Sequence, residues 1–128
     1  MSTMNHGLVG LYIILLIHLA GCSSQPRLSF RKDVYPILEQ NCLACHIPPD
    51  GKGYLKTHLN LQSYETLMKG TYYGPVILPG DSLHSILNML VEGRAEASMR
   101  MPHEREDPLT EDEIEVLRLW VDQGAHNN

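Results

Sequence analysis

The chain has 128 residues, 43% hydrophobic and 20% charged, which is typical of one small globular domain rather than of a disordered protein. Its formal net charge is -5 and no basic run occurs, so a phosphate backbone would be repelled and nucleic acid is not expected as a partner. With only six Tyr, one Phe and one Trp, the peptide core is modest, and a covalently attached apolar group would help to stabilise it.

An apolar stretch lies near the beginning of the sequence. It covers residues 8–20 and is interrupted only by His18, so it is too short to span a bilayer but suits the hydrophobic region of a signal peptide. It ends at Leu19-Ala20-Gly21-Cys22, which resembles the lipobox of bacterial lipoproteins, where the Cys thiol receives a diacylglycerol. The alternative interpretation is a transmembrane anchor or a buried helix.

The lipobox interpretation divides the chain into three parts. We predict a signal peptide at 1–21, a tether at 22–28 that begins with lipidated Cys22, and one domain at 29–126. Acyl chains contribute roughly 0.8 kcal/mol per buried CH₂, so such an anchor would hold the domain on a membrane. The expected location is therefore the bacterial cell envelope, facing the periplasm, and Ser23 favours the outer membrane.

Amphipathic helices are expected along the rest of the chain. In the first, residues recur at three- and four-residue spacing, with Asp33 as a possible N-cap and Pro36 in the first turn. These residues are Val34, Ile37, Leu38, Asn41, Cys42 and Cys45. A shorter helix is expected from a Ser63 cap to Gly70. The next has Asp81 or Ser82 as its cap and ends at Gly93, with one face made of Leu83, Ile86, Leu87 and Leu90.

The last predicted helix has the clearest local signature. Residues 110–113 fit a capping box of Thr110 and Glu113, and Leu109 can pack on Ile114 as a hydrophobic staple. The inward face is expected to hold Leu117, Trp120 and Val121, with Gly124 as the end. No segment alternates as a strand. The long connectors at 47–62 and 94–108 are expected to carry function.

The chemistry centres on Cys42-Leu43-Ala44-Cys45-His46. Thiols three residues apart at the end of a helix lie about one turn apart, so both can form thioethers with the two vinyl groups of one haem. His46 follows directly and is expected to bind the iron, which makes the spacing typical of c-type haem attachment. A redox dithiol would need a βαβ context, and a zinc site would need another close pair of ligands. Neither pattern is visible in the sequence.

A second axial ligand is needed for six-coordinate iron. Met68 and Met89 lie in helical patterns, where a thioether usually fills the core. Met99 and Met101 lie in the connector before the last helix, from which a loop can bring a sulfur to the far face of the haem. We assign Met101, with Met99 and His103 as the alternatives.

From Phe30 to Ala125 the chain resembles the small class I cytochrome c domains of the planctomycete type. The matching segments are residues 30–38, 41–46, 59–61, 79–82, 101–102, 109–110, 120–121 and 124–125. The resemblance implies an all-α, cytochrome c-like fold of three to five helices around one covalent haem c, with His46 and Met101 as axial ligands. It also implies that the first and last helices cross and that Trp120 packs in the crossing, next to the haem pocket.

These expectations describe an electron carrier rather than an enzyme. With both axial positions filled, the iron has no open site for a substrate, so the domain would pass single electrons between a redox protein donor and acceptor of the envelope. One alternative is a haem-bearing subunit of a larger envelope oxidoreductase. Another is a peroxidase-like or gas-sensing module, which would require a labile Met101. The pair Pro48-Pro49 is expected to offer a carbonyl to the second ring nitrogen of His46.

Overall fold

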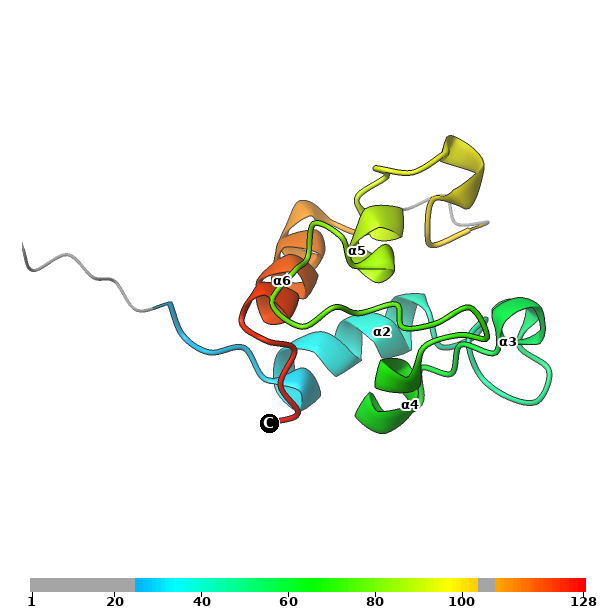
Figure 1. Ribbon diagram of the computed structural model, residues 1–128, viewed down its shortest axis with the longest axis horizontal. Helices are drawn as coiled ribbons and strands as arrows, with labels where there is room; N and C mark the ends of the chain where they lie inside the picture. The colour runs from blue at the N-terminus through cyan, green and yellow to red at the C-terminus, as the bar shows by residue number, and fades with distance from the viewer. Residues whose placement is uncertain (1–24, 104–107) are drawn as a thin grey trace, which may run out of the picture.

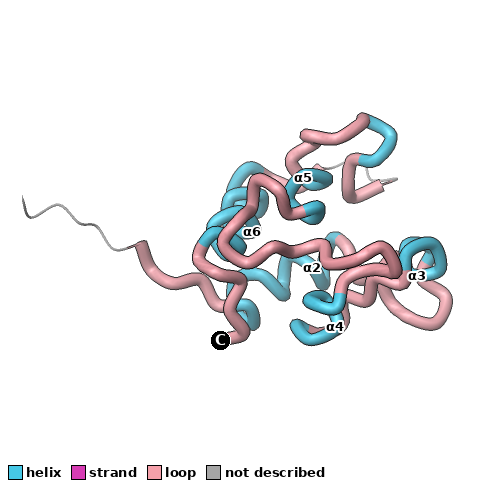
Figure 2. The backbone as a smooth tube through the Cα atoms, in the orientation of Figure 1, coloured by secondary structure: helices cyan, strands magenta, loops and turns pink. Residues whose placement is uncertain are grey.

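A computed structural model describes residues 25–103 and 108–128, so the predicted signal peptide and Cys22 lie outside the described residues. In these ranges the chain forms five α-helices, one π-helix and one 3-10 helix, joined by loops and without a β-strand (Figures 1 and 2). The helices are η2 (Phe30–Val34), α2 (Tyr35–Asn41), α3 (Lys52–Thr57), α4 (Tyr64–Lys69), α5 (Ile86–Val91), η3 (Ala97–Met99) and α6 (Glu111–Asp122). The predicted all-α fold is confirmed.

The first helical run begins earlier than the sequence pattern predicts. Ser29 caps it, because its hydroxyl accepts from the Lys32 N–H, while Asp33 accepts the Ser29 N–H at 2.6 Å. The predicted cap at Asp33 is therefore wrong: this residue is the reciprocal partner of the cap rather than the cap itself. The run opens as a π-helix and becomes α-helical directly before Pro36, which has no N–H to donate. It ends at Asn41, one residue before the first haem-motif cysteine.

The two middle helices differ in how far the sequence predicts them. The helix α4 is confirmed, with a capping box between Ser63 and Thr66, and it ends before Gly70, whose φ of 75° suits glycine. The helix α3 lies in the predicted connector 47–62 and was not expected. Its six residues include Gly53 and none of them is buried, so hydrophobic periodicity gives no signal for it.

The helix α5 starts later than predicted. The residue before it is Ser85, and Asp81 instead closes a turn by accepting the backbone N–H of His84 at 3.1 Å. The predicted cap at Asp81 or Ser82 is therefore wrong. The buried side chains of α5 are Asn88 and Val91. The predicted apolar face is turned outward at its beginning, because Leu83 is 61% exposed and Ile86 is 46% exposed.

The helix α6 agrees closely with the prediction. The Thr110 hydroxyl accepts the Glu113 N–H, and the Glu113 carboxylate accepts the Thr110 N–H at 2.8 Å, which completes the capping box. Leu117, Trp120 and Val121 are buried. The helix ends at Asp122, two residues before Gly124, whose φ is 102°.

The core forms where η2 packs against α6. The Trp120 ring, 1% exposed, lies 5.6 Å from the Phe30 ring and 6.4 Å from the Tyr64 ring. The Trp120 indole N–H donates to the His126 carbonyl at 3.0 Å. The crossing of the first and last helices is thus confirmed, with Trp120 in it. Contact between Trp120 and a bound haem stays a prediction.

The ends of the described chain meet the domain. The Leu28 N–H donates to the Gln123 side chain at 2.8 Å, and Gln123 donates to the Pro26 carbonyl at 3.3 Å. Part of the predicted tether 22–28 therefore contacts the end of α6. At the other terminus, the Ser29 hydroxyl donates to the Asn128 carbonyl at 2.6 Å. Among the described helices, none is long and apolar enough to cross a membrane.

Candidate functional site

The haem-attachment motif forms a hydrogen-bonded turn that continues from α2. The Cys42 N–H donates to the Leu38 carbonyl, and the Cys45 and His46 N–H groups both donate to the Cys42 carbonyl at 3.1 Å. Cys45 is exposed, Cys42 is half-buried and His46 is 9% exposed. The turn therefore brings the two sulfurs and the imidazole of the predicted site together on one short segment.

The helix α3 packs directly on this turn. The N–H groups of Gly53 and Tyr54 donate to the Cys45 carbonyl at 2.9 Å. A Cβ placed on Gly53 would lie 2.6 Å from Cε1 and 2.9 Å from each ring nitrogen of His46. A Cβ on Gly51 would lie 2.5 Å from the backbone oxygens of Cys45 and Ile47. Only glycine fits at these two positions without displacement, so the backbone itself supports the imidazole.

These glycines were not singled out from the sequence, although a signal for them exists. Gly51 and Gly53 follow the haem motif by only five and seven residues and lie in a segment with no other reason for two glycines. A second constraint also escaped the sequence reasoning. The Leu61 N–H donates to the His46 carbonyl at 2.9 Å, which holds the backbone of the histidine in place.

The environment of His46 favours a neutral imidazole. Burial lowers the pKa of His46 below its ordinary value of 6.5, because the charged form loses its hydration. A backbone interaction with Leu59 opposes this effect, and an electrostatic interaction with His103 adds to it. The Nδ1 atom is buried without a hydrogen-bond partner, so the predicted carbonyl from Pro48 or Pro49 is not present. A neutral ring nitrogen is the form that binds iron.

The candidate sixth ligands lie on the connector that follows α5. The Met101 N–H donates to the Leu90 carbonyl at 3.1 Å, and the half-buried Met101 side chain packs against the core. Met99 is 50% exposed, in η3. His103 is exposed, as a solvated loop histidine should be, but it is close enough to His46 to influence its pKa. The His46 and Met101 ligand pair stays a prediction.

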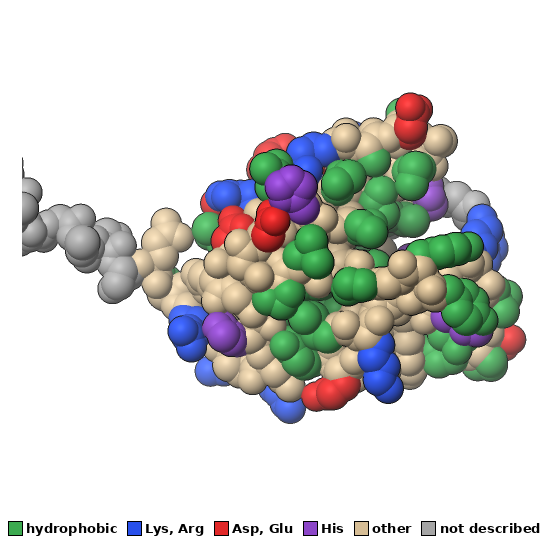
Figure 3. All heavy atoms as spheres, in the orientation of Figure 1, with side chains coloured by type: hydrophobic (Ala, Val, Ile, Leu, Met, Phe, Trp, Pro, Cys, Tyr) green, Lys and Arg blue, Asp and Glu red, His purple; other side chains and the backbone are tan. Residues whose placement is uncertain are grey.

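The surface between these elements is hollowed. Figure 3 shows a hollow between the part of the chain that carries α5 and η3 and the part that carries α3, with hydrophobic side chains on both sides. Leu83, before α5, and Ile86, at its first residue, leave apolar area exposed in the described chain. Covering such exposed apolar side chains with an apolar group is more favourable than leaving them in water.

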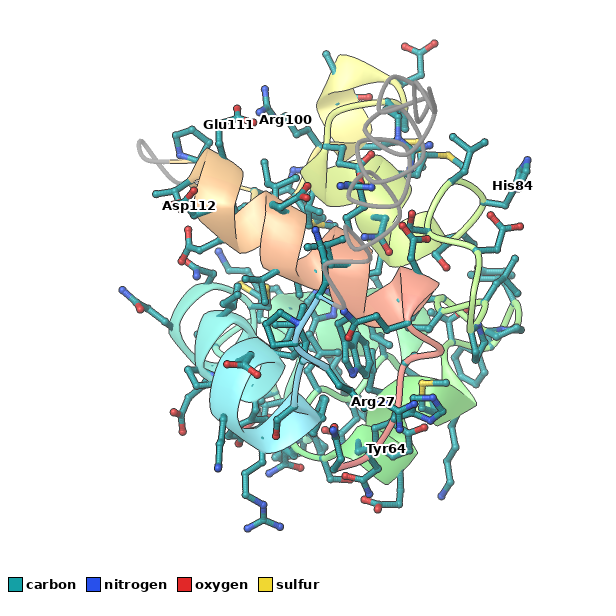
Figure 4. The ribbon with its side chains drawn as sticks, turned by 90° about the vertical axis from the view of Figure 1, so that its left-hand side faces the viewer. Arg27, Tyr64, His84, Arg100, Glu111 and Asp112 are labelled. Atoms are coloured by element: carbon teal, nitrogen blue, oxygen red, sulfur yellow. The ribbon has the colours of Figure 1, made fainter. Side chains whose placement is uncertain are left out.

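Two other histidines, His58 and His84, have partners that the sequence did not indicate. The ring of His58 stacks on Tyr54 at 4.9 Å and its Nε2 is 2.7 Å from the Tyr72 hydroxyl. His84 is exposed and points away from the domain (Figure 4), with its Nδ1 2.8 Å from Asp81. Within the described ranges no three His, Cys, Asp or Glu side chains are grouped to hold a metal ion by themselves.

Comparison with known proteins identifies this part of the chain. Residues 42–104 match the family model described as Planctomycete cytochrome C. They form a planctomycete cytochrome c domain. The match starts at the first cysteine of the motif and includes Met101, whereas the resemblance found in the sequence extends from Phe30 to Ala125. No curated protein and no solved structure matches the chain.

Membership of residues 42–104 in this family implies covalent haem c and haem-based electron transfer in general. The chain's own residues fit that group. Cys42, Cys45 and His46 have the required order and spacing, and His46 presents a buried imidazole backed by Gly53. The thioethers would come from the two cysteines and one axial ligand from His46.

Proposed function

We propose that the protein is a monohaem c-type cytochrome that transfers single electrons between redox partners of the cell envelope. The observation that carries this proposal is the buried, backbone-supported His46 directly after the exposed Cys45 in the turn of the haem motif. A half-buried Met101 on the connector after α5 is available as the second axial ligand. We assign Cys42 and Cys45 to the thioether bonds and His46 and Met101 to the axial positions. No residue is assigned a catalytic role.

The haem would supply a one-electron couple between ferrous and ferric iron. The polypeptide would tune that couple in three ways. His46 offers a neutral nitrogen in a dry environment, and Gly53 holds its ring in one orientation. Met101 offers a thioether, which favours ferrous iron relative to a second imidazole and so raises the potential. The core, in which η2 packs against α6, would hold the scaffold around the haem.

The location is a separate part of the proposal. Its support is the lipobox-like Leu19-Ala20-Gly21-Cys22 after the apolar stretch 8–20, together with a haem type whose thioethers form outside the cytoplasm. We propose a lipid anchor on Cys22, in a membrane of the bacterial cell envelope with the domain facing the periplasm. Metabolic labelling with a radioactive fatty acid tests it: label should enter the wild type and be absent from Cys22→Ala. Equal label in both would refute the anchor.

The axial assignment is tested by replacing the sixth ligand. Met101→Ala in the haem-loaded protein should abolish the sulfur-to-iron charge-transfer band of the ferric spectrum and convert the iron to high spin. Met99→Ala and His103→Ala are the matched controls on the same connector and should keep the low-spin spectrum. An unchanged Met101→Ala spectrum, with loss in one of the controls, would move the ligand to Met99 or His103. A high-spin wild type would favour a peroxidase-like or gas-binding module instead.

A further inference from the structure

Three large hydrophobic side chains are exposed at the α3 end of the domain, on α3 itself and on the turn bonded to its last residue. Leu55 on α3 is 61% exposed, and Tyr72 and Tyr73, in the turn between α4 and α5, are 69% and 88% exposed. The two segments are joined, because the Tyr72 N–H donates to the Thr57 carbonyl at 3.1 Å. We call Leu55, Tyr72 and Tyr73 the aromatic patch. Figure 3 shows hydrophobic side chains gathered on this part of the surface.

The aromatic patch is held in place by contacts within the domain. The Tyr72 ring lies 3.9 Å from the His58 ring and the Tyr72 hydroxyl is 2.7 Å from His58 Nε2. His58 in turn stacks on Tyr54. The turn itself is closed by the Thr71 N–H, which donates to the Gly74 carbonyl at 2.9 Å. Exposed apolar side chains that are already ordered lose little entropy when a partner covers them, which favours a binding role.

The aromatic patch also lies close to the haem-attachment turn. The helix that carries Leu55 is bonded through its Gly53 and Tyr54 N–H groups to the Cys45 carbonyl. Cys45 is exposed, and a surface depression next to it is lined by Ile47 and Lys52 as well. A protein seated on the aromatic patch would therefore lie near Cys45, one of the two residues proposed to hold the haem.

The segments that carry the aromatic patch have a charge opposite in sign to that of the whole chain. Lys52 and Lys56 are exposed on α3, and neither α3 nor the turn 71–74 contains an acidic residue, although the chain has a net charge of -5. One acidic side chain, Asp50, is exposed just before α3 and lines the depression next to Cys45. Others are exposed at the start of α6, for example Glu111 and Asp112 (Figure 4). A partner that approaches the patch would therefore be attracted through carboxylates.

The position of the aromatic patch favours a protein over a membrane as the occupant. Figure 1 shows the described chain entering the domain at one end of its long axis and α3 at the other. A domain tethered through its N-terminal segment would thus present α3 away from the membrane. We propose that the aromatic patch is the docking surface for a redox protein with an apolar centre rimmed by carboxylates. This inference rests on the proposed electron-transfer function.

The test measures electron transfer from the haem-loaded, reduced protein to an acidic blue copper protein of high potential, by stopped flow. One electron leaves ferrous iron, which becomes ferric, and reduces Cu(II) of the probe to Cu(I). Lys56→Glu should lower the second-order rate constant on the order of tenfold at low salt, and the loss should shrink at high salt. Lys32→Glu, an equal charge change on η2 at the far end, should stay within about twofold. Tyr73→Ser should slow transfer at both salt concentrations, because it removes apolar contact.

The other possible results would overturn either the docking surface alone or the proposed function as well. Equal losses in Lys56→Glu and Lys32→Glu, or an unaltered rate in Tyr73→Ser, would overturn the docking surface while leaving the electron carrier intact. Tyr73-dependent binding of the soluble domain to vesicles of phosphatidylglycerol would also overturn it, because the patch would then be a membrane contact. A wild type that carries covalent haem but reduces no copper protein, acidic or basic, would overturn the proposed function itself and the docking surface with it.

Discussion

The support of His46 by glycine backbone leads to a specific prediction for Gly53→Ala. The added Cβ would lie 2.6 Å from Cε1 of His46, whereas ordinary contacts begin at 3.4 Å, so ring and helix would have to separate by about 0.8 Å. Neither side moves easily. The Gly53 N–H donates to the Cys45 carbonyl and the His46 carbonyl accepts from the Leu61 N–H, both at 2.9 Å.

Two opposing effects set the size of the Gly53→Ala change. Alanine favours a helix over glycine by about 1 kcal/mol, which would stabilise α3. Overpacking of a buried group costs about 1–3 kcal/mol, which would destabilise the native state. The overpacking term wins, and we expect a net loss of about 1 kcal/mol in the free energy of unfolding. For a domain of this size the melting temperature should fall by about 4–8 °C.

Urea unfolding of the haem-loaded protein measures this loss, and the visible spectrum reports the ligand geometry at the same time. Lys56→Ala, on the exposed surface of the same helix, controls for the helix propensity and should be neutral or slightly stabilising. The Gly53→Ala protein should also show a shifted or weakened low-spin spectrum, because the ring of His46 is displaced. A variant as stable as Lys56→Ala with an unchanged spectrum would refute the argument that Gly53 supports the imidazole.

Three further substitutions test the fold around the site. Trp120→Ala should lower the free energy of unfolding by about 3–5 kcal/mol, because it leaves a cavity between η2, α4 and α6 where the ring is fully buried. Thermal or urea unfolding measures this loss, and a loss below about 1 kcal/mol would contradict the described core. Thr110→Ala should cost about 1 kcal/mol by losing the hydroxyl that caps α6, whereas the neighbouring, exposed Glu111→Gln should cost much less; equal costs would rule out the cap. Hydrogen bonds from His84 lower the pKa of Asp81 below its ordinary value of 3.8. The ionised Asp81 carboxylate therefore stabilises the folded state fully above about pH 3.8, and this stabilisation disappears as the pH falls through the lowered pKa. The melting temperature of Asp81→Asn should therefore lie below that of the wild type at pH 6 and approach it at strongly acidic pH; a constant difference at all pH values would exclude the ionised pair.

Local hydrogen bonding explains where the sequence predicts the fold well. The N-caps of α6, made by Thr110 and Glu113, and of α4, made by Ser63, could be predicted from the sequence. Each cap is a hydrogen-bonded interaction between residues only three apart in the chain. The same chemistry misleads when two candidates are present. The Ser29 hydroxyl accepts the Lys32 N–H, and the Asp33 carboxylate accepts the Ser29 N–H. Only the structure shows that the serine, not the aspartate, is the N-cap.

Long-range packing explains where the sequence predicts the fold poorly. The apolar spacing of α5 indicates a face to be covered, but periodicity does not say whether protein or a prosthetic group covers it. In the structure, Ile86 is outward and Asn88 is inward. The helix α3 is likewise defined by its contact with Cys45 and His46 rather than by its own pattern. The order of Cys42, Cys45 and His46 could be predicted from the sequence, whereas their support by Gly51 and Gly53 required the coordinates.

The most direct test of the account is the intact mass of the wild-type domain, residues 25–128, compared with that of the domain in which both haem-motif cysteines are substituted. Both proteins would be made in the periplasm of a host that matures c-type cytochromes. After extraction with acidic acetone, which removes non-covalent haem, the intact mass should exceed that of the polypeptide by one haem, and Cys42→Ala with Cys45→Ala should carry none. A colourless wild-type domain with the mass of its amino acids alone would contradict the proposal that this chain is a c-type cytochrome.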